Sequence, residues 1–263
     1  MPPPAADAPC PEQAFNATAL KWHTCAWLLL PVLVFLAGWM HWYAALPLTL
    51  LMAAGLTPRK RKEPQTRDSL PAFPLFTRSS FLALAAFAAL MALSGWGEWV
   101  NQHPDHIVRN ACLCELVASP WPVIFPDGNV LIYNTGFWLV PALAGKLAGL
   151  DAARVLVVLW GTWGLFLSWL WLCVFSGRRS LLLALLMAAF GSLLNFQCWL
   201  GLDLFRLHYF GTAEQIMCSA NASIPVLLFF IFLASGRMPL YWMPILFAAT
   251  AFYSPLAALG GLP

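Results

Sequence analysis

The residues best suited to chemistry lie in one polar stretch, residues 97–150, which is set between strongly apolar segments. Asp105 stands there beside His103 and His106. A carboxylate in this setting could take the proton from an acceptor hydroxyl as a general base, or bind a divalent cation together with the imidazoles. The sequence His-Pro-Asp-His is also typical of a solvated turn, because proline and aspartate both favour turns. Spacing alone favours the turn, so a catalytic Asp105 is a hypothesis.

Two further acids and a second polar cluster extend the set of candidates. Glu98 falls at the expected end of a membrane span, where an acid is more often an interfacial anchor than a catalyst, and Glu115 is a candidate second acid. Further along, residues 201–215 contain Arg206 and His208. Basic groups there could bind a lipid phosphate, which suits the planar guanidinium of arginine. An ordinary solvated loop is the alternative interpretation of this second cluster.

Aromatic side chains accompany these polar groups. Trp121 opens a Trp-Pro-Val sequence, and Tyr133 begins the run Tyr-Asn-Thr-Gly-Phe-Trp. Such rings could stack on sugars or on the isoprenyl groups of a lipid. Aromatic belts at membrane interfaces are the commoner explanation for rings in these positions.

The composition indicates that the helices which carry these residues lie in a membrane. The chain has 61% hydrophobic and 10% charged residues, and its mean hydropathy is +0.73. A soluble domain has about a quarter charged residues. Apolar runs recur with the length of bilayer-spanning helices, and the alternation typical of outer-membrane barrels is not seen. The net charge of +3 is carried by clustered basic residues, which indicate membrane topology and not nucleic-acid binding. We therefore predict an all-α, polytopic transmembrane bundle.

The chain divides into four parts. Residues 1–23 are proline-rich without periodicity and are predicted to be a disordered tail. Residues 24–57 are predicted to be a transmembrane hairpin, with a single long kinked helix as the alternative. Residues 58–78 form a basic linker, which the positive-inside rule places in the cytoplasm. Residues 79–263 complete the transmembrane region, which we expect to be incomplete at its C-terminus because no hydrophilic tail follows the last apolar segment.

Charge distribution decides how the stretch 131–150 lies. If it crossed the membrane, the next span would place Arg178 and Arg179 outside. If it lies in the interface, these arginines and Arg237 all face the cytoplasm. We therefore predict an interfacial helix at 131–150. The outer loop is then residues 97–152, on the extracytoplasmic face, and the spans total about seven. The expected spans after this loop cover residues 155–175, 180–200, 223–234 and 240–259, and the span at 223–234 requires that residues 217–222 also lie partly within the membrane.

Several motifs in this loop resemble a known family. Asp105, then Asn110 with the following alanine, then Ser-Pro-Trp-Pro-Val at 119–123, then Gly136 to Leu147 follow the order seen in bacterial membrane proteins of the GT-C glycosyltransferase fold. Relatives of this kind carry an Asp-Trp-x-Lys-His-Asn-Ala segment, a Trp-Pro-Val turn and a helix ending in Gly-Lys-Leu. The chain departs from the pattern in having His106 after the acid and no Lys-His pair, and it is shorter.

The resemblance implies a bacterial inner-membrane, multi-pass protein with membrane-parallel helices in its first outer loop. Such enzymes transfer a sugar from a polyprenyl-phosphate donor to an acceptor outside the cytoplasm, with the loop acid as base. The corresponding catalytic residues are Asp105, Glu115 and Glu98. The substrate-binding candidates are His103, His106, Arg109, Asn110, Trp121, Tyr133, Arg206 and His208. The expected partners are the lipid bilayer and the polyprenyl-phosphate-linked sugar, with no nucleic acid.

Two other classes of function remain open at this point. A transporter or flippase for a lipid or small solute would place ionisable residues or broken helices near the bilayer midplane. The expected spans hold almost no charge, which argues mildly against transport. A non-catalytic membrane scaffold is the third possibility.

Overall fold

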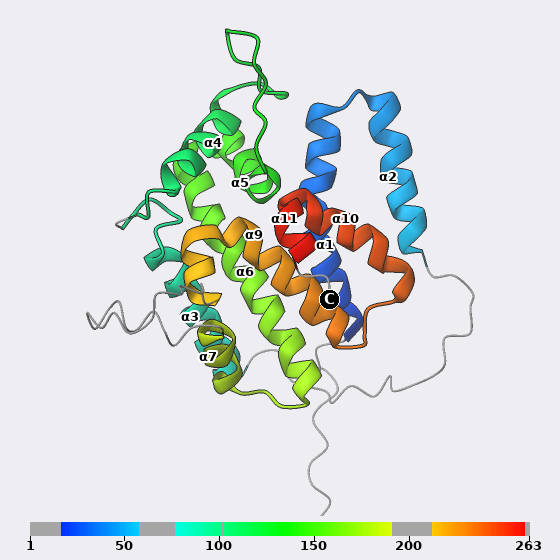
Figure 1. Ribbon diagram of the computed structural model, residues 1–263, viewed down its shortest axis with the longest axis vertical. Coiled ribbons are helices and arrows are strands. Elements are labelled where there is room, and N and C mark those ends of the chain that lie inside the picture. The colour runs from blue at the N-terminus through cyan, green and yellow to red at the C-terminus, as the bar shows by residue number, and fades with distance from the viewer. Residues whose placement is uncertain (1–16, 58–76, 101, 191–211, 261–263) are drawn as a thin grey trace, which may run out of the picture.

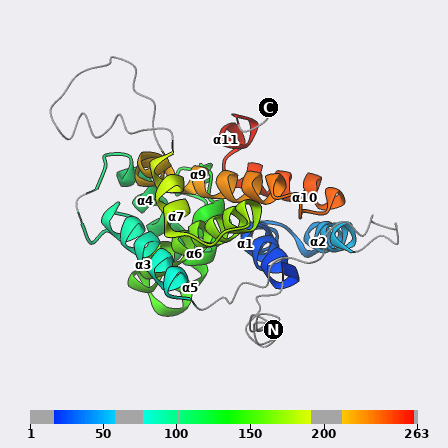
Figure 2. The same cartoon turned by 90° about the horizontal axis from the view of Figure 1, so that it is seen from below.

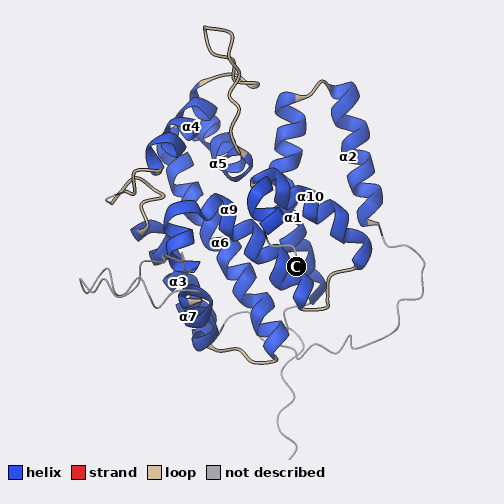
Figure 3. Ribbon diagram, viewed as in Figure 1, coloured by secondary structure: helices blue, strands red, loops and turns tan. Residues whose placement is uncertain are grey.

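The computed structural model describes residues 17–57, 77–100, 102–190 and 212–260, and within these ranges the chain is helical, without strands (Figures 1 and 3). The elements in chain order are α1 (Ala17–Trp39), α2 (Trp42–Leu56), α3 (Arg78–Leu93), α4 (His106–Ala118), α5 (Gly136–Ala148), α6 (Leu150–Ser176), α7 (Leu181–Ala189), α9 (Thr212–Ala234), the 3₁₀ turn η2 (Leu240–Trp242), α10 (Met243–Tyr253) and α11 (Pro255–Gly260). The predicted all-α class is confirmed for these residues.

The 27-residue helix α6 is the centre of the bundle. It packs against α5, α9, α3 and α1, and Figure 2 shows α3 at one end of the molecule and α2 at the other, with α1 and α6 between them. Two glycines allow its neighbours to come close. A Cβ at Gly161 would lie 2.3 Å from the Cε of Met91, and one at Gly164 would lie 2.6 Å from Ile224. Small residues at helix contacts are the usual means of close packing in membrane bundles.

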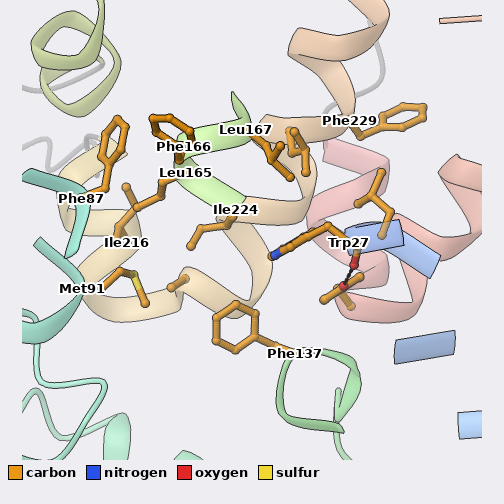
Figure 4. Close-up of a cluster of buried hydrophobic side chains, with 14 of the residues drawn as sticks. Trp27, Phe87, Met91, Phe137, Leu165, Phe166, Leu167, Ile216, Ile224 and Phe229 are labelled. Atoms are coloured by element: carbon orange, nitrogen blue, oxygen red, sulfur yellow. Dashed lines mark hydrogen bonds between the residues drawn. The ribbon is translucent and has the colours of Figure 1, made fainter. Parts of the chain in front are cut away.

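Aromatic side chains fill the contact between α1, α6 and α10. The Trp27 ring stacks on Trp160 and on Tyr253, with centroid distances of 5.1 and 5.3 Å. The polar atoms of these rings are also used: Trp27 Nε1 donates to the carbonyl of Trp160, and the Tyr253 hydroxyl donates to the carbonyl of Trp27. Figure 4 shows Trp27 in this interior with Ile224 and Phe137 nearby. The contact between these helices is therefore mainly apolar, and Trp27 and Tyr253 each direct a polar atom to a backbone carbonyl.

Three described helices are long and apolar enough to cross a membrane, judged by length and composition: Thr18–Trp39, Leu150–Ser176 and Gln215–Ala234. Shorter apolar helices are α2, α3, α5 and the segment Leu240–Tyr253. The chain therefore has the character of a helical membrane protein, and the total of about seven spans stays a prediction. Of the expected span 180–200, the structure describes only the part that contains α7.

The last expected span, 240–259, is broken in the structure. α10 ends at Tyr253, Ser254 is extended (φ −161°, ψ 103°), and α11 begins at Pro255. The residue before a proline is sterically pushed out of the helical region. The segment is therefore not one unbroken helix, and its passage through a membrane stays a prediction.

At the N-terminal side, the helix boundary differs from expectation. α1 begins at Ala17 and already buries Leu20, so residues 17–23 are helical although predicted to be tail. The remainder of that tail and most of the basic linker lie outside the described residues. α1 and α2 are separate helices with a break at Met40–His41. This is the arrangement expected of a hairpin and not of one long kinked helix.

The stretch predicted to lie in the interface contains α5, which has 13 residues. At about 1.5 Å per residue this gives about 20 Å, against about 30 Å for a bilayer core. α5 packs against α4 and α6, and Gly149, with φ 90°, turns the chain directly from α5 into α6. Its placement in the membrane interface stays a prediction.

Candidate functional site

The candidate site is built on the turn that follows α3. Gly95 (φ 88°) and Glu98 (φ 62°) both have left-handed backbone conformations, which reverse the chain within a few residues. The reversal buries Trp96, whose Nε1 donates a hydrogen bond of 2.8 Å to the carbonyl of Ile216 in α9. A positive φ is uncommon for a residue with a side chain. The turn is thus held by its contact with α9.

α4 faces α9 through two polar side chains on its buried side. His106 is fully buried, and its Nε2 lies 2.9 Å from the carbonyl of Met217. The guanidinium of Arg109 donates to the carbonyl of Cys218 and, at 3.2 Å, to the hydroxyl of Ser219. Positions i and i+3 lie on the same helix face, so one face of α4 delivers both donors to α9.

The acceptor segment of α9 is a break in the helix. Ser219 has φ −151° and ψ 46°, outside the helical region. The Ser223 hydroxyl also donates to the carbonyls of Ser219 and Gln215, at 3.0 and 3.4 Å. The carbonyls of five successive residues, 215–219, therefore accept side-chain hydrogen bonds. A helix break frees backbone carbonyls, and leaving them unpaired in an apolar interior is costly.

We call this contact the α4–α9 latch: Trp96, His106 and Arg109 as donors, and the carbonyls of residues 216–218 as acceptors. Trp96 also joins the donors to one another, because its ring lies edge-on to His106 at 4.8 Å and under the Arg109 guanidinium at 5.5 Å. The latch attaches α4 and the turn after α3 to a segment more than a hundred residues later in the chain.

Burial sets the protonation state of His106. Desolvation lowers the pKa of this imidazole, and the Arg109 guanidinium lowers it further, while the hydrogen bond to Met217 opposes the shift. A carbonyl oxygen can only accept, so Nε2 carries the proton of the neutral ring. Nδ1 then holds a lone pair, and this atom is buried without a hydrogen-bond partner.

Asp105 lies outside the latch. Its side chain is 55% exposed, with Oδ2 3.5 Å from Nδ1 of His103 and 3.9 Å from Nη2 of Arg109. Pro104 and Asp105 form a turn closed by the N–H of His106 on the carbonyl of His103 at 2.9 Å. The turn predicted from His-Pro-Asp-His is confirmed, and its acid projects outward at the start of α4.

The two imidazoles beside Asp105 do not come together. His103 is exposed and close to the acid, while His106 points into the latch. Across the described parts of the chain, no three His, Cys, Asp or Glu side chains are grouped as metal ligands. The expected shared cation site of Asp105 and both imidazoles is therefore not assembled by this geometry.

The other two candidate acids have partners elsewhere. Glu98 is bonded to Arg154 of α6 at 2.5 Å, and the same arginine contacts Asp151 at 2.9 Å. Glu115 accepts a hydrogen bond of 3.2 Å from the Ser119 hydroxyl. Glu98 thus joins the turn after α3 to the start of α6.

Glu98 and Glu115 both lie close to the thiol of Cys114. Burial raises the pKa of Cys114, and the charges of Glu98 and Glu115 raise it further, while Arg154 opposes them. Cys114 lies about 13 Å beyond Asp105 along α4, at about 1.5 Å per residue. The two glutamates therefore surround a different part of α4 from the exposed Asp105.

Asn110 has a positioning contact within the loop. Its Nδ2 donates to Oε1 of Gln102 at 2.8 Å, and Gln102 in turn donates to the carbonyl of Gly95 at 2.6 Å. This chain of bonds holds the segment before α4 against the turn after α3. Gln102 was not among the residues predicted from the sequence.

The predicted aromatic residues are packed against protein groups. Trp121 donates to the carbonyl of Leu116, its ring lies 4.9 Å from Trp39, and Lys146 sits 5.0 Å from its centroid. The peptide bond between Trp121 and Pro122 is cis. Tyr133 lies 5.6 Å from Trp138 and is 38% exposed. Of the two rings, Tyr133 is the more exposed, while Trp121 is partly buried.

The predicted phosphate-binding pair, Arg206 and His208, lies outside the described residues. Sequence reasoning also missed Trp96, which belongs to the latch, and Ser219 and Ser223, which lie at the break in α9. A signal for the last two was present, because the polar stretch Cys-Ser-Ala-Asn-Ala-Ser at 218–223 interrupts an apolar segment.

Comparisons with known proteins find no match for this chain among protein-family models, curated proteins or solved structures.

Proposed function

We propose that this chain is a bacterial inner-membrane protein that transfers a sugar from a polyprenyl-phosphate donor to an extracytoplasmic acceptor. The proposal starts from the resemblance of residues 95–150 to GT-C glycosyltransferases. The structural observation that carries it is the position of Asp105, an exposed carboxylate at the start of a helix whose buried side chains His106 and Arg109 are attached to α9. A general base needs both access to its substrate and a fixed position.

In the proposed reaction, Asp105 takes the proton of an acceptor hydroxyl while the hydroxyl oxygen bonds to the anomeric carbon of the sugar. The bond between that carbon and the phosphate oxygen breaks, and polyprenyl phosphate leaves with the bonding electrons. Arg109 and His103 are the polar groups beside Asp105 and would orient the carboxylate. Arg206 and His208 would contact the donor phosphate, and Tyr133 would offer a ring to the donor.

The test is sugar transfer by membranes that contain the full chain. A labelled polyprenyl-phosphate sugar is supplied, and transferred label and released polyprenyl phosphate are both measured. Asp105→Asn should lower the rate by about 10²–10⁴-fold, the usual contribution of a general base. The matched control is Asp127→Asn, an exposed acid that bonds locally to Asn129, and it should keep the wild-type rate. Full transfer by the Asp105→Asn protein would refute the catalytic assignment.

A transporter is the second candidate, and the break in α9 at Ser219 is the observation that favours it. Transporters often carry broken helices at their binding sites. Here, however, side chains occupy the carbonyls at the break. Uptake of a polyprenyl-phosphate sugar by reconstituted vesicles, without sugar transfer, would favour transport over the enzymatic proposal.

A further inference from the structure

The outer part of α9, residues 212–219, is attached to its surroundings differently from the remainder of that helix. Beyond the break, α9 buries Ile224, Leu228 and Phe232 in the core. Before the break, Ile216 is the one fully buried apolar side chain among the described residues, and side-chain donors from the turn after α3 and from α4 bond to the backbone carbonyls of residues 216–218. A segment held by one buried apolar side chain and a few polar contacts next to a helix break is suited to open as a unit, separately from the remainder of the helix.

His106 is the contact in the latch that a change of charge can break. The imidazole is fully buried, and Nδ1 has no acceptor. A proton added to Nδ1 would therefore be a buried donor without a partner, and the ring would carry a buried positive charge. Both are costly unless the ring reaches water.

The charged groups near His106 also disfavour a positive charge on its ring. From its own helix and turn these are Arg109, His103 and Asp105, of which the two basic groups oppose a positive charge and the acid favours it. Arg109 is buried, whereas Asp105 is exposed and screened by solvent. Among the described contacts, the turn after α3 presents the Trp96 ring and α9 presents the Met217 carbonyl. No carboxylate in these contacts is buried against the ring to balance its charge.

We propose that the α4–α9 latch is an acid-sensitive switch, in which protonation of His106 releases residues 212–219 of α9 from α4. Release would take the imidazolium and the Arg109 guanidinium into water. It would also free the start of α4, where Asp105 directly precedes His106. The switch rests on the latch alone and holds whether or not Asp105 is catalytic.

The direction of the pH effect follows from the lowered pKa of His106. The open and unfolded states bind the proton more readily than the closed state. The closed latch is therefore fully stable above the ordinary histidine pKa of about 6.5. It loses stability as the pH falls below that value towards the lowered pKa of the closed state.

The test is backbone hydrogen–deuterium exchange of the full chain in lipid nanodiscs, corrected for the pH dependence of intrinsic exchange. Peptides from 212–219 should be protected at neutral pH and should lose at least about tenfold protection below the histidine pKa of about 6.5. Peptides from the middle of α6 provide the internal reference. His106→Gln supplies a neutral N–H donor for the Met217 carbonyl and should remain protected throughout. His103→Gln, which removes the exposed neighbour, should behave like the wild type.

Equal protection of 212–219 at both pH values would overturn the proposal. So would the same acid-induced loss in the His106→Gln protein, because no titrating ring remains there. If that variant does not fold, the wild-type titration still decides. A midpoint at or above the ordinary histidine pKa of about 6.5 contradicts a switch that depends on a buried, destabilised imidazolium.

Discussion

The centre of the bundle and the end that carries α4 are held together by different forces. At the centre, Trp27 stacks on Trp160 and on Tyr253, and the Trp27 Nε1 and the Tyr253 hydroxyl bond to backbone carbonyls of residues in the same stack. These groups are uncharged at ordinary pH, and their contact depends on the close fit of large rings. Dispersion between well-packed rings is insensitive to pH and salt.

At the outer end, three side chains donate to backbone carbonyls of a broken helix, and an arginine and a histidine are two of them. Hydrogen bonds from charged donors are strong but depend on geometry and on protonation. One helical bundle thus combines a closely packed aromatic centre with an end where the contact between α4 and α9 depends on the charge of its side chains. The exposed candidate acid, Asp105, belongs to the second region.

The largest expected effect is at the centre. Trp27→Ala removes a fully buried ring and should lower the free energy of unfolding by about 3–5 kcal/mol, as measured for large-to-small changes in packed cores. The matched control is Trp42→Ala, because Trp42 is 77% exposed. Unfolding in detergent micelles measures both. Equal losses for the two variants would contradict the central role of the aromatic stack.

The next effect tests the latch. Arg109→Met keeps much of the volume but removes the donors to the carbonyl of Cys218 and the hydroxyl of Ser219. We expect a loss of about 1.5–3 kcal/mol, the range for hydrogen bonds from charged groups. Arg109→Lys should not restore it, because an ammonium lacks the planar fork. The exposed Arg178, changed to Met, serves as control and should leave stability unchanged.

A smaller effect is expected at the ion pairs that join the turn after α3 to α6. Arg154 contacts Glu98, whose side chain is 20% exposed, and Asp151, whose side chain is 94% exposed. A double-mutant cycle with Glu98→Gln and Arg154→Gln should give a coupling of about 1 kcal/mol. The cycle with Asp151→Asn should give less, because that carboxylate is almost fully hydrated. A larger coupling for Asp151 would contradict the anchoring role of Glu98.

Sequence reasoning was successful where local composition decides structure. High hydropathy and clustered basic residues indicated a helical membrane protein, and the helical hairpin predicted within residues 24–57 corresponds to the separate helices α1 and α2. The turn at Pro104 and Asp105 followed from the preferences of its residues. These features depend on neighbours in the chain, which a single sequence displays directly.

Sequence reasoning could not reach the latch, because each of its bonds joins residues more than a hundred positions apart and ends on a backbone carbonyl. Every residue carries a backbone carbonyl, so no sequence pattern distinguishes the carbonyls that accept these bonds. His106 therefore looked like a partner of Asp105, whereas its ring turns inward to Met217. The span was predicted to begin only at residue 223 because the polar stretch at 218–223 interrupts the apolar segment. In the structure, α9 already begins at Thr212. That interruption marks the helix break itself.

The most direct test of the central claim compares His103 and His106 in one protein. The claim is that α4 turns His106 into the latch while His103 stays in solvent beside Asp105. Histidine ethoxyformylation of the intact protein at neutral pH, localised by tandem mass spectrometry, gives both rates. We predict that His103 reacts at least about tenfold faster, since opening a site that costs about 1.4 kcal/mol slows its modification by that factor. Equal rates, or faster modification of His106, would contradict the latch.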